Sequence, residues 1–245
     1  MLKKEIIIDR IQNTINTIKK KYSSTRKTIN YERQINYYKD EICKKKLIIQ
    51  KNIEKVENIM IVAHPDDETI FGMNELHNGE KWLLIICTNS IDGRIGVTRK
   101  DIPGVIQMSK DYNFNLAVIQ HFDYNEYDIT NARFDKKVYD YLKKYLLKQE
   151  WQKIITHNKD GEYGHTQHIL VHRIVSTILF NNNVNYKDFK VFDFSNDILN
   201  DISLPEKILR KYYWLGGGIL EFNSHKVCTK NEEPMNYDMT NVLCE

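Results

Sequence analysis

From residue 58 onward, short apolar runs alternate with segments of helical periodicity. The apolar runs have the length of buried strands and comprise residues 59–63, 82–87, 116–119, 153–156 and 190–194. Helical signals fall between them, at residues 66–79, 134–148 and from His165, and a short helix is predicted at 204–213. Because strands alternate with helices, we expect an α/β fold with a mainly parallel sheet flanked by helices.

A different pattern precedes this alternation. Residues 1–21 repeat isoleucine at steps of four, four and three, which predicts one apolar stripe of an amphipathic helix. A second helix is predicted after the break at residues 23–25, with an apolar side formed by Ile35, Tyr38 and Ile42. We therefore divide the chain into a helical N-terminal extension (1–55), a main α/β domain (56–222) and an irregular C-terminal tail (223–245).

Charge is distributed unevenly between these parts. Residues 1–55 carry 15 Lys and Arg against 6 Asp and Glu, a net charge of +9, whereas residues 56–245 carry 21 against 27, a net charge of −6. We interpret the basic extension first as a solvated helical face. It could instead contact an anionic partner or pair with another subunit. We do not expect nucleic acid to be a partner.

The sequence shows no membrane span and no secretory signal. No run approaches 18 consecutive apolar residues, and the N-terminus is charged from Lys3 onward. Cys43, Cys87, Cys228 and Cys244 are scattered and lack the C-x-x-C spacing of a structural zinc site or a redox pair. We therefore expect a chain without a transmembrane helix that works in a reducing, cytoplasmic environment.

Candidate chemistry is concentrated in two segments. Residues 63–68 read Ala-His-Pro-Asp-Asp-Glu, and residues 161–168 read Gly-Glu-Tyr-Gly-His-Thr-Gln-His. Each segment follows a predicted strand and precedes a predicted helix. In open α/β sheets, ligands bind outside the carboxyl ends of the strands. The two segments therefore have a structural reason to meet.

Their residue types are those of a mononuclear metal hydrolase. His64, Asp67 and His168 can supply three protein ligands to a divalent ion and leave one position for water. Asp66 is the carboxylate that remains, and it is the candidate general base. His165 lies one helical turn before His168 and is placed to stabilise a tetrahedral oxyanion and to protonate a leaving group.

The two segments together resemble the PIG-L/LmbE family of N-deacetylases. The resemblance rests on the strand that ends in residues 63–68, on Thr156-His157-Asn158 and on residues 161–168, and it spans roughly residues 57–215. It implies a Rossmann-like fold, with residues 56–222 as the catalytic domain. It also implies zinc-dependent removal of an acyl group, usually acetyl, from an amino sugar in a glycoconjugate.

By position, the resemblance assigns the same roles as the ligand chemistry. It implies His64, Asp67 and His168 as metal ligands, Asp66 as general base and His165 as the histidine that stabilises the oxyanion and protonates the amine. Family members also tend to carry an arginine after the second strand that contacts substrate. Arg99 is the preferred candidate for that role, and Arg94 is the alternative.

Two positions qualify this comparison. Many bacterial members have an aspartate immediately before the last metal histidine, thought to orient the acid histidine, and this chain has Gln167 there. His172 stands four residues after His168, but the His-Glu-x-x-His pattern of metalloproteases is absent. We therefore expect His172 to be structural.

We expect a zinc-dependent N-deacetylase that acts on an N-acetylglucosamine-type glycoconjugate, with another divalent ion possible in place of zinc. A metal amidase with a non-sugar substrate, such as an acylated antibiotic or peptide, would have the same metal site. The third hypothesis is a non-catalytic binding protein that keeps the fold and holds an anionic partner through residues 1–55. A substrate panel separates the first two hypotheses, and metal binding separates both from the third.

Overall fold

The computed structural model describes residues 47–88, 91–92, 97–98, 101–119, 134–198, 208, 211, 225–239 and 243–244. The two helices predicted for the N-terminal extension lie outside the described residues, as does the predicted helix at 204–213 apart from Ile208 and Lys211. Among the described helices, none is long and apolar enough to cross a membrane.

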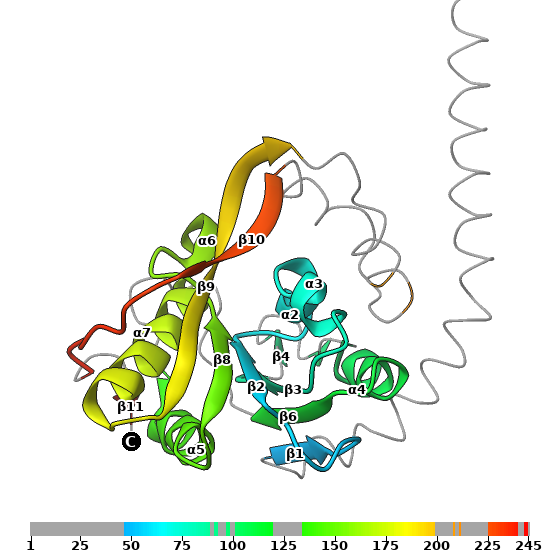
Figure 1. Cartoon of the computed structure of the whole chain (residues 1–245), viewed down its shortest axis with the longest axis horizontal. Coiled ribbons are helices and arrows are strands. Elements are labelled where there is room, and N and C mark those ends of the chain that lie inside the picture. Colours follow the sequence, from blue (N-terminus) through cyan, green and yellow to red (C-terminus); the bar gives the residue numbers. More distant parts are fainter. Residues whose placement is uncertain are drawn as a thin grey trace, which may run out of the picture. The chain divides into compact units, whose positions relative to one another are not determined.

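A mixed sheet of seven strands forms the centre of the described chain, in the order β1-β6-β3-β2-β8-β9-β10 (Figure 1). Its strands are β1 (Leu47–Gln50), β2 (Asn58–Val62), β3 (Trp82–Ile86), β6 (Asn115–Ile119), β8 (Trp151–Thr156), β9 (Tyr186–Ile198) and β10 (His225–Asn231). The five central strands pair in parallel, whereas β1 and β10 pair antiparallel at the two edges. The predicted α/β class is confirmed.

The central strands were recognisable because helices cover both faces of the sheet. Every residue of β2, β3 and β6 is buried, so each reads as a continuous apolar run and not as an alternation. The apolar core on one face comes from these strands and from α5 (Lys136–Leu146) and α7 (Thr166–Asn181). Helices α2 (Asp67–Ile70), α3 (Met73–Leu76) and α4 (Asp101–Asp111) lie on the other side of the sheet (Figure 1).

The helix predicted at 66–79 is two short helices, α2 and α3. Gly72 separates them, and a Cβ at that position would meet Sδ of Met60 on β2 at 2.5 Å. The Met60 side chain would have to shift to make room for a larger residue, so a glycine suits the close approach of this segment to the sheet. The sequence did not predict the break, because the close packing of Gly72 against Met60 joins two residues that are not adjacent in the sequence.

The described parts of both terminal segments add edge strands to the sheet, which therefore extends beyond residues 56–222. Strand β1 pairs with β6, and the loop after it is held by Asn115, whose Oδ1 accepts from the backbone N–H groups of Asn52 (2.7 Å) and Ile53 (2.9 Å). Strand β10 pairs with β9, and the segment after it docks on α7, where the Met235 N–H donates to Oγ of Ser176 at 2.6 Å.

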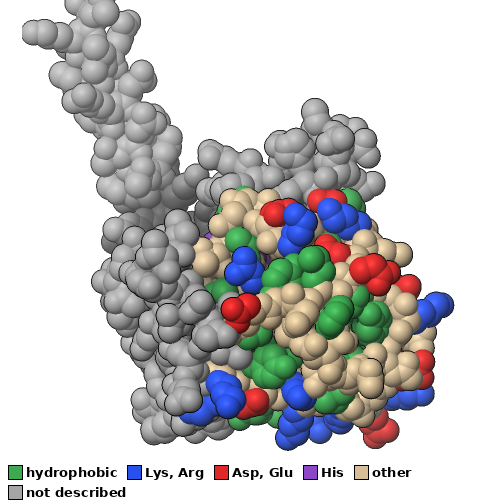
Figure 2. Space-filling view, turned by 90° about the vertical axis from the view of Figure 1, so that its left-hand side faces the viewer, with side chains coloured by type: hydrophobic (Ala, Val, Ile, Leu, Met, Phe, Trp, Pro, Cys, Tyr) green, Lys and Arg blue, Asp and Glu red, His purple; other side chains and the backbone are tan. Residues whose placement is uncertain are grey.

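Smaller elements complete the described structure. Strands β4 (Ile91–Asp92) and β5 (Val97–Thr98) pair antiparallel, and β7 (Phe134–Asp135) pairs in parallel with β11 (Leu243–Cys244). Figure 2 shows the molecule from the side of α5 and α7, where exposed hydrophobic side chains lie among charged side chains of both signs.

The strand order fixes where a ligand site can form. From β2, the next parallel strands β3 and β6 extend in one direction, whereas β8 and β9 extend in the other. The order therefore reverses between β2 and β8. In doubly wound sheets, this reversal opens a crevice at the carboxyl ends of the two strands. The first motif follows β2, and the second follows β8.

Candidate active site

The ends of β2 and β8 are joined directly at the strand-order reversal. The chain leaves β2 through Ala63 and His64, and it leaves β8 through His157. The Ala63 N–H donates to Nε2 of His157 at 3.0 Å, and both groups are buried. This bond connects the two motif segments, which are 94 residues apart in the sequence.

Three buried donor groups converge beside this link. Nδ1 of His64 lies 3.2 Å from Oδ2 of Asp67 and 3.3 Å from Nε2 of His168. Nε2 of His168 lies 3.3 Å from Oδ1 of Asp67. In a tetrahedral zinc site with bonds of about 2.0–2.1 Å, donor atoms are about 3.3–3.4 Å apart. The spacing of these side chains therefore fits an ion of that size.

Neighbouring side chains set the tautomers of both histidines. Oε1 of Gln167 accepts from Nε2 of His64, which leaves the lone pair on Nδ1. Oε2 of Glu162 accepts from Nδ1 of His168 at 2.6 Å, which leaves the lone pair on Nε2. Both lone pairs are therefore on the nitrogen atoms nearest to Asp67. Such partners orient the imidazoles of metal sites and raise their basicity.

Asp67 is ionised in this setting. Burial alone would raise its pKa, but the neighbouring His168 and His64 hold the pKa of the carboxyl well below its usual range. The backbone N–H of His64 also donates to Oδ2 at 2.7 Å. When both imidazoles are neutral, this carboxylate and the two nitrogen atoms beside it are a suitable ligand set for a divalent cation.

Asp66 has an unusual backbone conformation. Its φ is 128° and its ψ is −28°, a region that residues other than glycine rarely adopt. The buried Glu68 supports this geometry, because its Oε2 accepts from the Asp66 N–H at 3.0 Å. Asp66 stands at the N-cap of α2, but its side chain makes no capping hydrogen bond. Strain of this kind concentrates at functional sites.

His165 lies next to the donor groups, at the start of α7. Its ring stacks on His168 with 4.4 Å between centroids and lies edge-on to His64 at 4.8 Å. It is only partly buried, whereas its two ring neighbours are buried. Tyr163, half exposed, packs edge-on against the rings of His165 and His168. His165 and Tyr163 therefore form the accessible side of the site.

The region that holds this site is similar to a known protein family. The family model described as PIG-L, GlcNAc-PI de-N-acetylase, matches residues 59–179. The match extends from β2 to α7, so it contains both motif segments. At the level of the domain, the resemblance inferred from the motifs is confirmed, and a PIG-L domain indicates a hydrolase of the deacetylase type.

Two further similarities extend beyond this domain. The chain is 28% identical over 200 residues to "Uncharacterized protein L374" of Acanthamoeba polyphaga mimivirus, which covers 75% of this chain and 85% of that protein. The crystal structure of the conserved protein TT1542 from Thermus thermophilus superposes with a TM-score of 0.52 at 12% identity. It covers 75% of this chain and 98% of that protein. The second similarity shows a shared fold.

Sequence reasoning gave no role to two residues in the centre of the PIG-L domain, Glu162 and His157. Glu162 accepts from Nδ1 of both His157 (3.0 Å) and His168, and burial alone would raise its pKa. The charges and hydrogen bonds of the two histidines outweigh burial and lower the pKa of Glu162 to about 2. Glu162 adopts φ 59° and ψ −62°, in a turn closed by Asn158. In the sequence, only the position of Glu162 within residues 161–168 could have indicated a role for it.

His157 is also close enough to share an ion with Asp67 and His168. Its Nε2 lies 3.4 Å from Asp67, but that nitrogen already accepts from the Ala63 N–H. Its ring stacks on His168 with 3.8 Å between centroids. We therefore interpret His157 as a support for His168.

The remaining predicted residues fall into two groups. His172 is buried, and its Nδ1 donates to the carbonyl oxygen of His157 at 2.9 Å, which is the structural contact expected of it. Arg99 and Arg94, the residues predicted to contact substrate, lie outside the described residues.

Proposed function

We propose that this protein is a zinc-dependent N-deacetylase that hydrolyses the acetamide of an N-acetylglucosamine-type glycoconjugate. The convergence of His64, Asp67 and His168, with both imidazole tautomers fixed by neighbours, is the observation that supports it most directly. When bound there, zinc would polarise the amide carbonyl and lower the pKa of a water molecule. Another divalent ion of similar size would suit the same donors.

Asp66 is the general base in this proposal. It lies between two of the proposed ligands in the sequence and is buried beside them, held in place by its contact with Glu68. Its carboxylate takes a proton from the attacking water as the water oxygen bonds to the acetamide carbon. The other carboxylates of the two motifs are less suitable: Asp67 belongs to the donor set, and Glu162 is bound to two histidines. Glu68 accepts from the Asp66 N–H and from the Thr69 hydroxyl.

His165 is the general acid. As an imidazolium, it stabilises the negative charge that develops on the carbonyl oxygen. It then gives its proton to the amine as the carbon–nitrogen bond breaks, so acetate and a free amino sugar leave. Its position on the accessible side of the site, between the donor groups and Tyr163, suits a group that meets the substrate. The half-exposed Tyr163 ring offers a surface on which the apolar face of a sugar can stack.

Metal content tests this proposal without any assumption about the substrate. We expect about one zinc per chain in the wild type by mass spectrometry, because the possible donor groupings of this cluster share His168. We expect much less in His168→Ala. Wild-type protein that is metal-free and takes up no added zinc would contradict the proposal and favour a binding protein.

Acetate release tests the reaction itself. Asp66→Asn should retain its metal but lose at least about 100-fold in turnover, the usual loss when a general base is removed. Asp160→Asn, at an exposed neighbouring carboxylate, is the matched control. A panel of N-acetylated amino sugars, acylated peptides and acylated small amines then identifies the substrate class. Turnover of only the non-sugar amides would retain the hydrolase and reject the sugar substrate.

A further inference from the structure

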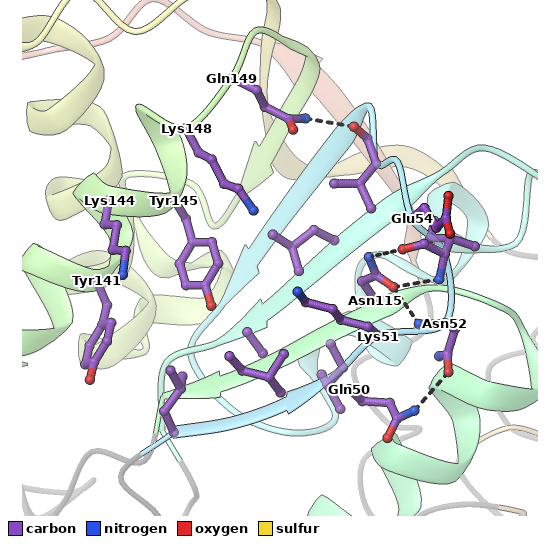
Figure 3. Close-up of a pocket in the computed structure, with 17 residues that line it drawn as sticks. Gln50, Lys51, Asn52, Glu54, Asn115, Tyr141, Lys144, Tyr145, Lys148 and Gln149 are labelled. Carbon is purple, nitrogen blue, oxygen red and sulfur yellow. Dashed lines mark hydrogen bonds between the residues drawn. The ribbon is translucent and has the colours of Figure 1, made fainter.

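A second cavity lies at the opposite edge of the sheet from the histidine cluster. It has a volume of about 760 Å³ and lies between α5 on one side and β1 with the loop 51–54 on the other (Figure 3). Its lining includes Leu83 and Asn115, which stand at the amino ends of β3 and β6. His64 and His157, by contrast, follow the carboxyl ends of β2 and β8. The cavity is therefore separate from the proposed active site.

Side-chain hydrogen bonds hold the cavity walls in place. Asn115 accepts from the backbone N–H groups of Asn52 and Ile53 through Oδ1, and it donates to the Ile53 carbonyl through Nδ2 at 2.8 Å. On the helix side, Nε2 of Gln149 donates to the Val56 carbonyl at 2.7 Å. Because both walls are fixed before any ligand arrives, little ordering would be needed on binding.

The floor of the cavity is apolar. Leu47 and Ile49 of β1 line it together with Leu83 and Ala117. Ile49 lies opposite Ala117 in the β1–β6 pairing, so these side chains share one face of the sheet. Ile49, on the edge strand β1, is 51% exposed, which is a large exposure for a residue of this type. An apolar molecule placed on this floor would be favoured by the hydrophobic effect.

The rim is cationic. Lys51 comes from the loop, whereas Lys144 and Lys148 come from α5 and the turn that follows it. Figure 3 shows the amino groups of Lys51 and Lys148 pointing into the space between the walls, with the Tyr145 hydroxyl beside them. Within the described part of the chain, none of the three lysines forms an ion pair. The one acidic residue of the lining, Glu54, lies beyond Asn115 in this view.

We propose that this cavity binds an organic phosphate monoester with an apolar body, the apolar part on the sheet floor and the phosphate between Lys51 and Lys148. Two ammonium groups and a tyrosine hydroxyl match the charge and the acceptor oxygens of a phosphate dianion.

Calorimetric titration of the full chain tests whether binding needs both the phosphate and the apolar body of the ligand. The probes are decyl phosphate below its critical micelle concentration, decanol and inorganic phosphate. We expect decyl phosphate to bind at least about tenfold more tightly than either of the others, because each lacks one of the two contributions. Decanol that binds as tightly as decyl phosphate would overturn the role of the lysines.

Substitutions at the cavity rim test where the ligand binds. The double variant Lys51→Met with Lys148→Met keeps most of each aliphatic chain and removes the charge, so affinity for decyl phosphate should fall by about tenfold or more. Lys143→Met, on α5 but outside the cavity lining, is the matched control. Undiminished binding in the double variant would overturn the proposal. So would loss of binding in Asp66→Asn, which would place the ligand in the active site.

Vesicle sedimentation distinguishes a membrane lipid from a soluble phosphate ester as the ligand. Cosedimentation with phosphatidylcholine vesicles that contain phosphatidic acid, reduced in the double variant, would identify a membrane lipid as the ligand. Binding of decyl phosphate in solution without cosedimentation would identify a soluble phosphate ester. Neither result depends on the deacetylase proposal, because the probes carry no acetamide group.

Discussion

Oε2 of Glu162 lies 2.6 Å from Nδ1 of His168 and 3.0 Å from Nδ1 of His157. One buried carboxylate thus holds two stacked imidazoles, one of which belongs to the proposed metal site. Because Glu162 accepts a hydrogen bond from the Nδ1–H group of His168, the Nε2 lone pair of that ring is directed toward the other donors.

We predict that Glu162→Gln weakens zinc binding by about 10- to 100-fold, the usual cost of removing such a carboxylate partner. A neutral amide accepts the Nδ1 proton less strongly, so the imidazole becomes a poorer ligand. Competition with a chromogenic chelator measures the change. Asp160→Asn, two residues earlier and exposed, should bind zinc like the wild type. Equal affinity in Glu162→Gln and the wild type would show that His168 is oriented by other contacts.

Gln167 has the corresponding role for His64. Gln167→Leu removes the acceptor for the Nε2 proton, and we expect zinc affinity to fall by about tenfold because the His64 tautomer is no longer fixed. Gln167→Glu keeps an acceptor at the same position and should retain most of the affinity. If the leucine and glutamate variants bind zinc equally, the contact with Gln167 does not control the tautomer.

We predict that the positive φ of Asp66 reduces stability at a position whose carboxylate is needed for activity. Asp66→Gly can adopt φ 128° without steric strain, whereas Asp66→Ala cannot. We expect the glycine variant to be about 1 kcal/mol more stable than the alanine variant in urea unfolding, even though glycine usually destabilises ordered backbone. Both variants should lack turnover, because both lose the carboxylate. A more stable alanine variant would show that the backbone at this position is not strained.

We predict that the stability of the folded chain depends on pH through His172. Burial lowers the pKa of its imidazole from 6.5 to about 4 in the folded chain. Between these two values the unfolded chain binds a proton that the folded chain does not, so the free energy of unfolding decreases as the pH falls. The full effect of such a shift is about 3–4 kcal/mol.

His172→Gln should remove this contribution, so stability measured at pH 7 and at pH 4 should differ less in the variant than in the wild type. Urea unfolding at the two pH values gives the comparison. His77→Gln, at an exposed position, controls for the loss of an imidazole. An unchanged difference in His172→Gln would assign the acid sensitivity to other groups.

Much of the fold could be predicted from the sequence because its central strands are buried on both faces. Strands β2, β3 and β6 read as apolar runs, and the alternation with helices indicated a parallel sheet. The edge strands β1 and β10 were missed because an edge strand is only partly buried and its pattern is weak. The break at Gly72 was missed because its close packing against Met60 joins residues that are distant in the sequence.

The sequence by itself determined which residue types stand after β2 and β8, and therefore the chemistry available at that edge of the sheet. Only the tertiary structure decided that Glu162 and Gln167 set the histidine tautomers, that Asp66 has a strained backbone, and that lysines near α5 and in the β1 loop border one cavity. Residue chemistry and strand periodicity are local properties of the chain. Tautomers, strain and cavities arise from contacts such as that of His64 with Gln167, which are 103 residues apart in the sequence.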